Sequence, residues 1–413
     1  MRFIADLHIH SKYSRATSKD MSPENLWRWA QLKGISIIGT GDFTHPKWFK
    51  ELNEKLQSAD NGLFMLRSDL MTNDIPDLCK AEVFFILTAE ISCIYSKNGK
   101  TRKIHSLIFT PNFADAAKIN IALSKIGNLN TDGRPILGLD AKELLKIVLN
   151  ESPDSMLIPA HAWTPHFSIF GAASGFDYFE ECFEELTPHI YAIETGLSSD
   201  PLMNWRLSAL DKITLISNSD AHSPKKIGRE ANIFDIEISY KSITDAIKTK
   251  NGFIGTIEFF PEEGKYHYDG HRACGISMSP KETIKNNYLC PVCGKEVTIG
   301  VMHRIERLAD REEGFRPKDA PPFYSIIPLP EIIADVLKIG VNSKKVDKDY
   351  QDILNKLGSE FKILMDIPIK DIEQANYSLL AEAISQMRKG DVYIAPGYDG
   401  EYGKIKLKRT EDK

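Results

Sequence analysis

The chain has 413 residues, of which 42% are hydrophobic and 26% are charged, and its formal net charge is −5. That length exceeds one ordinary domain, so we expect two or three domains with true apolar cores. The acidic balance excludes a protein that binds nucleic acid through overall positive charge, so a polyanion would have to meet local basic patches or bound cations. No apolar run reaches the ~18 residues of a membrane span and the first residues lack a signal-peptide pattern, so we expect a cytoplasmic protein.

Short apolar runs alternate with helical stretches from residue 1 to residue 255. A helix is predicted from Pro23 to Lys33, with Ser22 as its N-cap and Gly34 as its end. The predicted strands lie at 3–7, 35–39, 84–87, 106–109, 156–158, 191–193 and 213–216, and a further helix lies at 141–149. This repetition predicts a parallel sheet, either open or closed into a barrel.

The character of the sequence changes after residue 255. Residues 256–320 combine aromatic, polar and cysteine residues with little apolar periodicity, and a proline-rich joint follows from Pro317 to Pro330. Residues 321–413 resume globular patterning and end in a glycine-rich stretch. We therefore expect three domains, at 1–255, 256–320 and 321–413.

Histidines and carboxylates follow the predicted strands at their C-terminal ends. His8 and His10 stand two residues apart on an extended segment, where both point to one side, and Asp220 and His222 repeat that spacing. Further candidates at strand ends or just beyond are Asp42, His45, Glu90, His105 and His161. A single buried histidine is more often a core residue than a ligand, but two such pairs fit that explanation poorly. Imidazoles and carboxylates suit zinc, manganese or iron, and their number predicts more than one metal.

A second metal site is predicted in residues 256–320. Six cysteines in the whole chain are too few for a disulfide framework. Two pairs share the spacing typical of a structural zinc site, and they consist of His271 with Cys274 and Cys290 with Cys293. His267 is the alternative fourth ligand, and a set of free thiols is the alternative to zinc. The other cysteines, Cys79, Cys93 and Cys182, have no such context and are expected to be buried apolar side chains.

The segments Asp6–Ser11, Pro159–His161 and Ser219–His222 together resemble the PHP (polymerase and histidinol phosphatase) superfamily over residues 1–255. The resemblance implies a distorted barrel of seven strands with a trinuclear metal site. The expected fold class is therefore α/β: a distorted (β/α)7 PHP barrel, a small zinc-binding domain and a C-terminal α/β domain.

The same resemblance implies roles for individual residues. His8, His10 and Asp220 would bind the first metal, and Glu90 would bridge the first and second. His105 and His161 would bind the second metal, and His222 the third. The residues expected to carry catalysis are His8, His10, Glu90, Asp220 and His222.

Two positions depart from the superfamily pattern. Arg15 stands where many members have Asp, and Phe43 stands where many have His. The third metal therefore lacks two usual ligands, so Asp42 or His45 substitutes or that metal is weak or absent. Arg15 would instead hold a phosphate oxygen.

Longer phrases resemble the endonuclease Q family over nearly the whole chain; they lie at residues 39–46, 194–201, 217–224, 290–294 and 396–400. That family nicks DNA on the 5′ side of deaminated bases (hypoxanthine, uracil) and of abasic sites. The resemblance implies a metal-dependent DNA-repair endonuclease with two or three divalent metals (zinc, manganese or magnesium) in its active site and one structural zinc. It also implies that the zinc-binding and C-terminal domains grip the duplex.

Six residues are candidates for contact with this DNA substrate: Arg15, Trp163, Phe170, Lys225, Arg229 and Tyr398. The cations would meet phosphates and the aromatic rings would stack on an everted base. Core packing is an equal alternative for Trp163, and turn chemistry for Tyr398. A repair or replication protein as a further partner stays open.

Two rival functions remain at this stage. A small-molecule phosphatase would use the same metals, although the 150 or so residues after the barrel argue against it. A DNA-binding module accessory to a helicase, with a degraded metal site, would account for Arg15 and Phe43. The preferred lesion, the physiological metal and the oligomeric state are not determined by the sequence.

Overall fold

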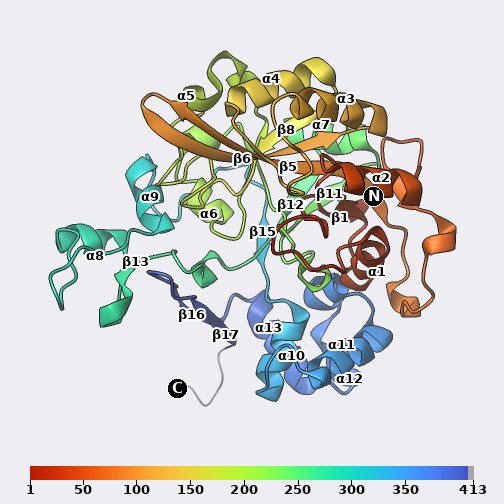
Figure 1. Cartoon of the computed structure of the whole chain (residues 1–413). Coiled ribbons are helices and arrows are strands. Elements are labelled where there is room, and N and C mark those ends of the chain that lie inside the picture. Colours follow the sequence, from red (N-terminus) through yellow and green to blue (C-terminus); the bar gives the residue numbers. More distant parts are fainter. Residues whose placement is uncertain (408–413) are drawn as a thin grey trace.

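A computed structural model of the chain describes residues 1–407, and its elements fall into three regions (Figure 1). The N-terminal region is a mixed sheet with helices packed on its faces. The cysteine-containing region projects to one side of it, and a group of C-terminal helices packs below it in this view. Within residues 1–407, no helix has both the length and the apolar composition needed to cross a membrane.

The central sheet runs in the order β15-β12-β11-β1-β2-β5-β4-β3, with β6 and β7 also paired to β5 and β8 paired to β6. β1 pairs in parallel with β2, and β2 with β5, but β6, β11 and β12 are antiparallel to neighbours. The sheet is therefore mixed, where the sequence predicted a parallel one. Its strands are β1 (Arg2–Asp6), β2 (Ile37–Gly39), β3 (Leu56–Ser58), β4 (Phe64–Leu66), β5 (Phe84–Lys97), β6 (Lys100–Thr110), β7 (Ile136–Leu137), β8 (Met156–Pro159), β11 (Ala231–Asp235), β12 (Phe253–Glu258) and β15 (Phe323–Ser325).

Within residues 1–407, backbone pairing does not close the sheet into the expected distorted barrel of seven strands. β9 (Ala192–Glu194) and β10 (Thr214–Ile216) pair with each other and stand apart from the central sheet. Buried asparagine side chains bridge one of the gaps: Asn218 Oδ1 accepts the backbone N–H of Leu7 at 2.8 Å, and Asn232 Oδ1 accepts that of Ser217 at 2.9 Å. Side-chain amides thus satisfy backbone groups that a continuous ladder would pair.

Helices of the N-terminal region cover the sheet, and their ends follow the sequence signals. In α1 the Ser22 side chain accepts from Asn25 N, Pro23 occupies the first turn, and Gly34 ends the helix at φ 86°. The sequence prediction for this helix is confirmed. The helices are α1 (Pro23–Lys33), α2 (Pro46–Lys55), α3 (Phe113–Ser124), α4 (Ala141–Glu151), α5 (Phe179–Phe183), α6 (Pro201–Asn204) and α7 (Tyr240–Thr249).

Apolar side chains pack on both faces of the sheet. Along β1, Phe3 and Ala5 join the buried cluster that contains Ile243 and Ile247 of α7, whereas Ile4 packs against the larger cluster on the other face. This alternation is the period-two pattern of a strand that is covered on both sides.

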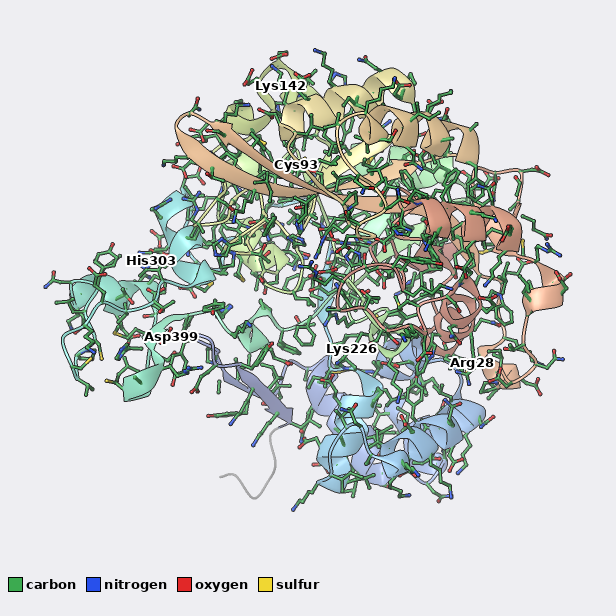
Figure 2. All side chains as sticks on the ribbon, viewed as in Figure 1. Arg28, Cys93, Lys142, Lys226, His303 and Asp399 are labelled. Carbon is green, nitrogen blue, oxygen red and sulfur yellow. The ribbon has the colours of Figure 1, made fainter. Side chains whose placement is uncertain are left out.

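The cysteine-containing region is a small unit attached to the C-terminal hairpin. Its elements are β13 (Asp269–His271), β14 (Ile276–Met278), α8 (Pro280–Lys285) and α9 (Val301–Leu308), and the hairpin is β16 (Val392–Ala395) and β17 (Lys404–Leu407). Asp399 at the hairpin tip accepts from Arg272 N and from Thr298 Oγ1, each at 2.6 Å (Figure 2). A backbone bridge between Tyr268 and Tyr398 adds to this attachment.

The C-terminal region is mostly helical, although an α/β domain was predicted there. Its helices are α10 (Leu329–Leu337), α11 (Lys344–Leu357), α12 (Ile369–Gln374) and α13 (Ser378–Arg388). The strands of this region do not pack with these helices as one sheet. β15 joins the central sheet, and β16 pairs with β17 beside the cysteine-containing region. A buried ion pair of 2.7 Å between Lys33 and Glu360 ties α1 to these helices. The three domain boundaries stay a prediction.

Candidate metal centre

Four of the predicted ligands meet where the segments after β1 and β10 face the middle of β5, since Glu90 lies well inside that strand and not at its end as predicted. The ligand atoms of His8, His10, Glu90 and Asp220 all lie within 4.8 Å of one another. His10 Nε2 is 3.0 Å from Asp220 Oδ1 and 3.2 Å from Glu90 Oε2. His8 Nε2 is 3.6 Å from Glu90 Oε2 and 3.7 Å from Asp220 Oδ1. We call this set the first ligand group.

A second ligand group shares Glu90 with the first and adds His105 and His161. Glu90 Oε1 lies 2.7 Å from His105 Nδ1 and 3.0 Å from His161 Nε2. The other carboxylate oxygen, Oε2, faces the first group. One buried carboxylate therefore presents an oxygen to each group, which is the geometry of a bridging ligand.

The unsatisfied atoms of the first group fit a metal. His8 Nε2, His10 Nε2 and Asp220 Oδ1 are buried, and despite their short mutual distances they make no hydrogen bond of acceptable geometry with the described residues. A buried polar atom without a partner costs stability, and a cation among these atoms would remove that cost for all three. The donor set of two imidazoles and two carboxylates suits zinc or manganese.

Two carboxylates behind the histidines fix the orientation of the rings. His8 Nδ1 lies 3.0 Å from Glu194 Oε1, and His10 Nδ1 lies 3.0 Å from Asp42 Oδ1. With its proton on Nδ1 donated to a carboxylate, each imidazole presents the lone pair of Nε2 to the ligand group. Glu194 also accepts from the backbone N–H of His161 at 2.9 Å, so it links both groups.

The ligand side chains differ in the direction of their pKa shifts. Burial alone would raise the pKa of Glu90, but the fixed charge of Arg134 and hydrogen bonds from His10 and His105 hold it well below its usual range. The pKa of Asp220 is also lowered, since His8 and His10 outweigh the effect of burial. Burial lowers the pKa of His105 to about 4. The carboxylates are thus ionised and His105 is neutral at pH 7, whereas the neighbouring carboxylates raise the pKa of His8, His10 and His161, so a metal would have to displace a proton from these histidines.

Sharp turns after β2, β8 and β10 place the side chains of Asp42, His161 and Asp220. Asp42, His161 and Asp220 have φ values of 50°, 28° and 47°, a region that residues other than glycine enter at a cost. Gly41 has φ 61°, and a Cβ there would lie 2.2 Å from Ile9 O. The glycine of the Gly-Asp phrase therefore allows Asp42 to approach His10.

Asp42 and His45 lie outside both ligand groups. Both oxygens of Asp42 are engaged, since Oδ1 faces His10 and Oδ2 accepts from Ser11 N, Ser11 Oγ and Ser14 Oγ. Asp42 therefore orients His10, and metal binding by Asp42 or His45 stays a prediction. His45 stacks on Tyr13 with ring centroids 4.5 Å apart, and it belongs to neither ligand group.

His222 lies beside the first group but is not part of it. Its ring centroid is 4.5 Å from that of His10, and its Nδ1 lies 2.8 Å from the backbone oxygen of Asp220. Its role as ligand of a third metal stays a prediction.

Two predicted substrate contacts, Trp163 and Phe170, are core residues instead. Trp163 is fully buried and donates from Nε1 to Asn204 Oδ1 at 2.8 Å, and Phe170 packs on it. The aromatic residue of this loop that reaches the site is Phe167, which is half-buried, with its ring centroid 4.6 Å from that of His105. The sequence offered several aromatic residues here, and only the fold distinguishes those that pack inward.

Two of the three predicted basic contacts, Arg229 and Lys225, are already engaged within the chain. Arg229 donates from Nε to the backbone oxygen of Ser219 at 2.8 Å, so it braces the turn that carries Asp220. Lys225 is half exposed and pairs with Asp347 of α11 at 2.6 Å. Arg15 is exposed, and Tyr398 packs over Gly270. Contact of Arg15, Lys225 and Tyr398 with DNA stays a prediction.

Sequence reasoning missed Arg134, which lies in the segment before β7. Its Nη1 is 3.0 Å from Glu90 Oε2. The signal was a lone arginine in an Asp-Gly-Arg-Pro turn, which nothing in the sequence linked to the histidines.

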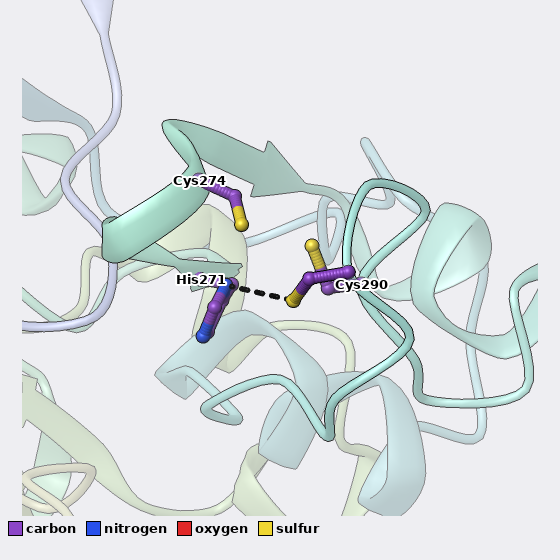
Figure 3. Close-up of side chains that lie close together, drawn as sticks. His271, Cys274 and Cys290 are labelled. Carbon is purple, nitrogen blue, oxygen red and sulfur yellow. Dashed lines mark hydrogen bonds between the residues drawn. The ribbon is translucent and has the colours of Figure 1, made fainter.

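The cysteine-containing region holds a third ligand group. His271, Cys274, Cys290 and Cys293 place their ligand atoms within 4.8 Å of one another, and Figure 3 shows three of them turned inward. Burial raises the pKa of Cys290, but backbone N–H groups of Cys293 and Val292 outweigh this and lower it to about 7. A thiolate is the form that binds zinc. The alternative ligand, His267, is buried and stacks on Tyr268 outside this group.

The three remaining cysteines are buried, as predicted. Burial raises the pKa of Cys79 to about 11 and that of Cys182 to about 12. Burial likewise raises the pKa of Cys93. These thiols are inert at neutral pH.

Fold and site together define a mixed α/β protein with two ligand groups that share one carboxylate. The MJ0043 C-terminal domain family matches residues 328–391. The uncharacterized protein MJ0043 of Methanocaldococcus jannaschii is 34% identical over 60% of this chain, and that match spans only 32% of its own length.

Two solved structures are similar over the whole chain. The lesion-specific endonuclease PfuEndoQ from Pyrococcus furiosus is 33% identical, with a TM-score of 0.86, covering 100% of this chain and 98% of its own. Endonuclease Q in complex with a 27-mer duplex substrate, with an abasic lesion at its active site, is 33% identical with a TM-score of 0.83, covering 99% and 97%. This chain belongs to the endonuclease Q family.

Proposed function

We propose that the chain is a metal-dependent DNA-repair endonuclease that hydrolyses a phosphodiester on the 5′ side of deaminated bases and abasic sites. The observation that carries the proposal is Glu90, whose two oxygens face two ligand groups in a chain of the endonuclease Q family. The relative that was crystallised with abasic duplex DNA supports the substrate class.

The residues present fit divalent cations, which would be held by His8, His10, Glu90 and Asp220 in one group and by His105 and His161 with Glu90 in the other. Bound there, such cations lower the pKa of a coordinated water and polarise phosphoryl oxygens. Glu194 and Asp42 keep the histidine rings aimed at the centre. The centre lies between the segments that follow β1 and β10 and the middle of β5.

The third ligand group, here called the His271 group (His271, Cys274, Cys290 and Cys293), is proposed to bind one zinc ion with a structural role. The apolar cluster of this region is small, consisting of Met278, Cys290 and Val297 with a few partly buried neighbours. Such a core needs a further constraint to stay folded. We assign duplex binding to this region and to the C-terminal hairpin that Asp399 attaches to it.

A nicking assay tests the proposal. Labelled duplexes with one deoxyinosine, uracil or abasic site are incubated with Mn²⁺ or Mg²⁺, beside an undamaged duplex. We expect one cut on the 5′ side of the lesion, absent in His8→Ala and retained in His189→Ala, which removes an exposed histidine.

The rival functions predict other outcomes. Hydrolysis of para-nitrophenyl phosphate without any cut in lesion DNA would indicate the small-molecule phosphatase. Binding of lesion DNA without a cut, by protein shown to be loaded with metal, would indicate the accessory module. Either outcome contradicts the endonuclease.

A further inference from the structure

The guanidinium of Arg134 lies at the edge of the first ligand group. Nη1 is 3.0 Å from Glu90 Oε2, the oxygen that faces His8 and His10. Glu90 is fully buried, whereas the side chain of Arg134 keeps 28% of its surface exposed. The side chain of Arg134 therefore extends from the buried ligands to the solvent, where a substrate can reach it.

The turn that carries Arg134 is fitted closely to the site. Asp132 Oδ1 accepts the backbone N–H of Arg134 at 3.1 Å and that of Arg15 at 3.3 Å. Gly133 N donates to Tyr13 O at 3.0 Å. A Cβ on Gly133 would lie 2.3 Å from Asp42 Oδ2, so only glycine allows this approach. The turn thus packs against the carboxylate that orients His10, and Arg134 is held in a defined place.

The charge of Arg134 conflicts with a purely structural role. Arginine stays protonated in proteins, and it lies beside carboxylates that would hold divalent cations. A fixed positive charge at that place would repel bound metal cations. It would become favourable when an anion binds to the metals and to the guanidinium at the same time. The planar guanidinium offers N–H donors that match phosphate oxygens.

We propose that Arg134 is a catalytic residue that donates hydrogen bonds to a non-bridging oxygen of the scissile phosphodiester. The inference rests on the proposed function. In the hydrolysis, the oxygen of water bonds to phosphorus, the bond from phosphorus to the leaving deoxyribose oxygen breaks, and that oxygen ends as a hydroxyl with a proton from the water. Arg134 stabilises the negative charge that grows on the phosphoryl oxygens.

The test uses the full chain loaded with Mn²⁺ and inorganic phosphate as the probe, with affinity measured by calorimetry. The variants are Arg134→Met and Arg134→Lys. The matched control is Arg67→Met, because Arg67 is exposed and pairs with Asp69, away from the ligand groups. The metal content of each variant is measured by atomic emission before the titration.

We expect full metal loading in every variant, with phosphate affinity at least tenfold weaker in Arg134→Met, partly recovered in Arg134→Lys and unchanged in the control. Phosphate binding by Arg134→Met within twofold of the wild-type affinity would overturn the inference, as would a wild-type protein that binds no phosphate. Failure of Arg134→Met to load metal would also overturn it, since Arg134 would then only hold Glu90 in position.

Failure of the proposed function gives a different pattern. In that case loaded wild-type protein binds phosphate in a manner that depends on Arg134, yet it cuts no lesion duplex. If the duplex is cut, single-turnover incision by Arg134→Met should be at least 100-fold slower, with partial rescue by added guanidinium ions. Absence of rescue together with unchanged phosphate affinity contradicts the assignment.

Discussion

Glu194 and Asp42 orient two histidines of the first ligand group. Each lies 3.0 Å from the Nδ1 atom of a histidine whose Nε2 faces the first ligand group. Such carboxylates fix the tautomer and increase the basicity of the ligand. Glu194 also contacts the second ligand group, because it accepts the backbone N–H of His161.

Glu194→Gln should therefore weaken Mn²⁺ binding roughly 10- to 100-fold, because the amide replaces a charged acceptor for His8. Competition with a chromophoric chelator measures this affinity. The control Glu237→Gln, at an exposed glutamate, should bind as the wild type does. Equal affinity in both variants would show that Glu194 does not support His8.

Glu258 is a buried acid below the site. Its Oε2 accepts from Thr195 Oγ1 at 3.1 Å and from Ser217 Oγ at 3.0 Å, and burial raises its pKa to about 8. Between its usual value of 4.5 and that raised value, the native chain binds a proton that the unfolded chain has released. The contribution of Glu258 to stability is therefore full at pH values below its usual pKa and is lost as the pH rises towards 8.

Glu258→Gln removes that titration. From pH 5 to pH 8, the free energy of unfolding of the variant should rise relative to that of the wild type by more than about 1 kcal/mol. Urea unfolding at the two pH values measures the difference. Parallel pH dependence in the two proteins would contradict the protonated state of Glu258.

Much of the ligand set was predictable because its pattern is local. His8 and His10 follow a strand at a spacing that fixes their common side, and Asp220 and His161 stand after other strands. The role of Asp42 was not predictable, since its oxygens are engaged by Ser11, Ser14 and His10 through a turn that depends on Gly41. Arg134 comes from a distant turn that only the fold brings to Glu90.

At the scale of elements, the ends of α1 and the positions of β1, β8, β9 and β10 followed the sequence. β5 and β6 extend well beyond the predicted 84–87 and 106–109, and the predicted barrel closure was not formed. α1 begins and ends at its capping residues because these interactions are local. Closure depends on contacts between distant segments, and here Asn218 and Asn232 link the end of β10 to β1 and β11 in place of a backbone ladder. An asparagine after a strand, such as Asn218, or inside one, such as Asn232, gives no such signal in the sequence.

The β13–β14 unit tests the zinc assignment. Cys293→Ser should release one equivalent of zinc per chain and increase hydrogen exchange in β13–β14, since its apolar cluster is small. The exchange of β5 and β6 should stay unchanged. Metal analysis and exchange measured by mass spectrometry read out both effects.

The control for this experiment is Val292→Ser. Val292 is exposed, lies between Cys290 and Cys293 in the sequence, and offers no ligand atom. That variant should retain its zinc. Zinc content unchanged in Cys293→Ser would contradict the assignment of the His271 group.

At the scale of the whole molecule, contacts between segments distant in sequence join the three regions. The sheet supplies the ligand groups, the cysteine-containing region is attached through the C-terminal hairpin, and the helices α10–α13 are joined to α1 by the buried pair of Lys33 and Glu360 (Figure 1). The regions that follow the sheet in sequence thus contact it in space. The composition indicated several domains but did not predict these contacts.

The central claim is that the two ligand groups joined by Glu90 cut DNA beside a lesion. It is tested most directly by titrating metal-free protein with Mn²⁺ while single-turnover incision of an abasic duplex and bound metal are both measured. We predict no incision without metal, a cooperative rise that needs more than one metal per chain, and loss of both second-metal binding and incision in Glu90→Gln. Full incision by metal-free or singly loaded protein, or wild-type incision by Glu90→Gln, would contradict the claim.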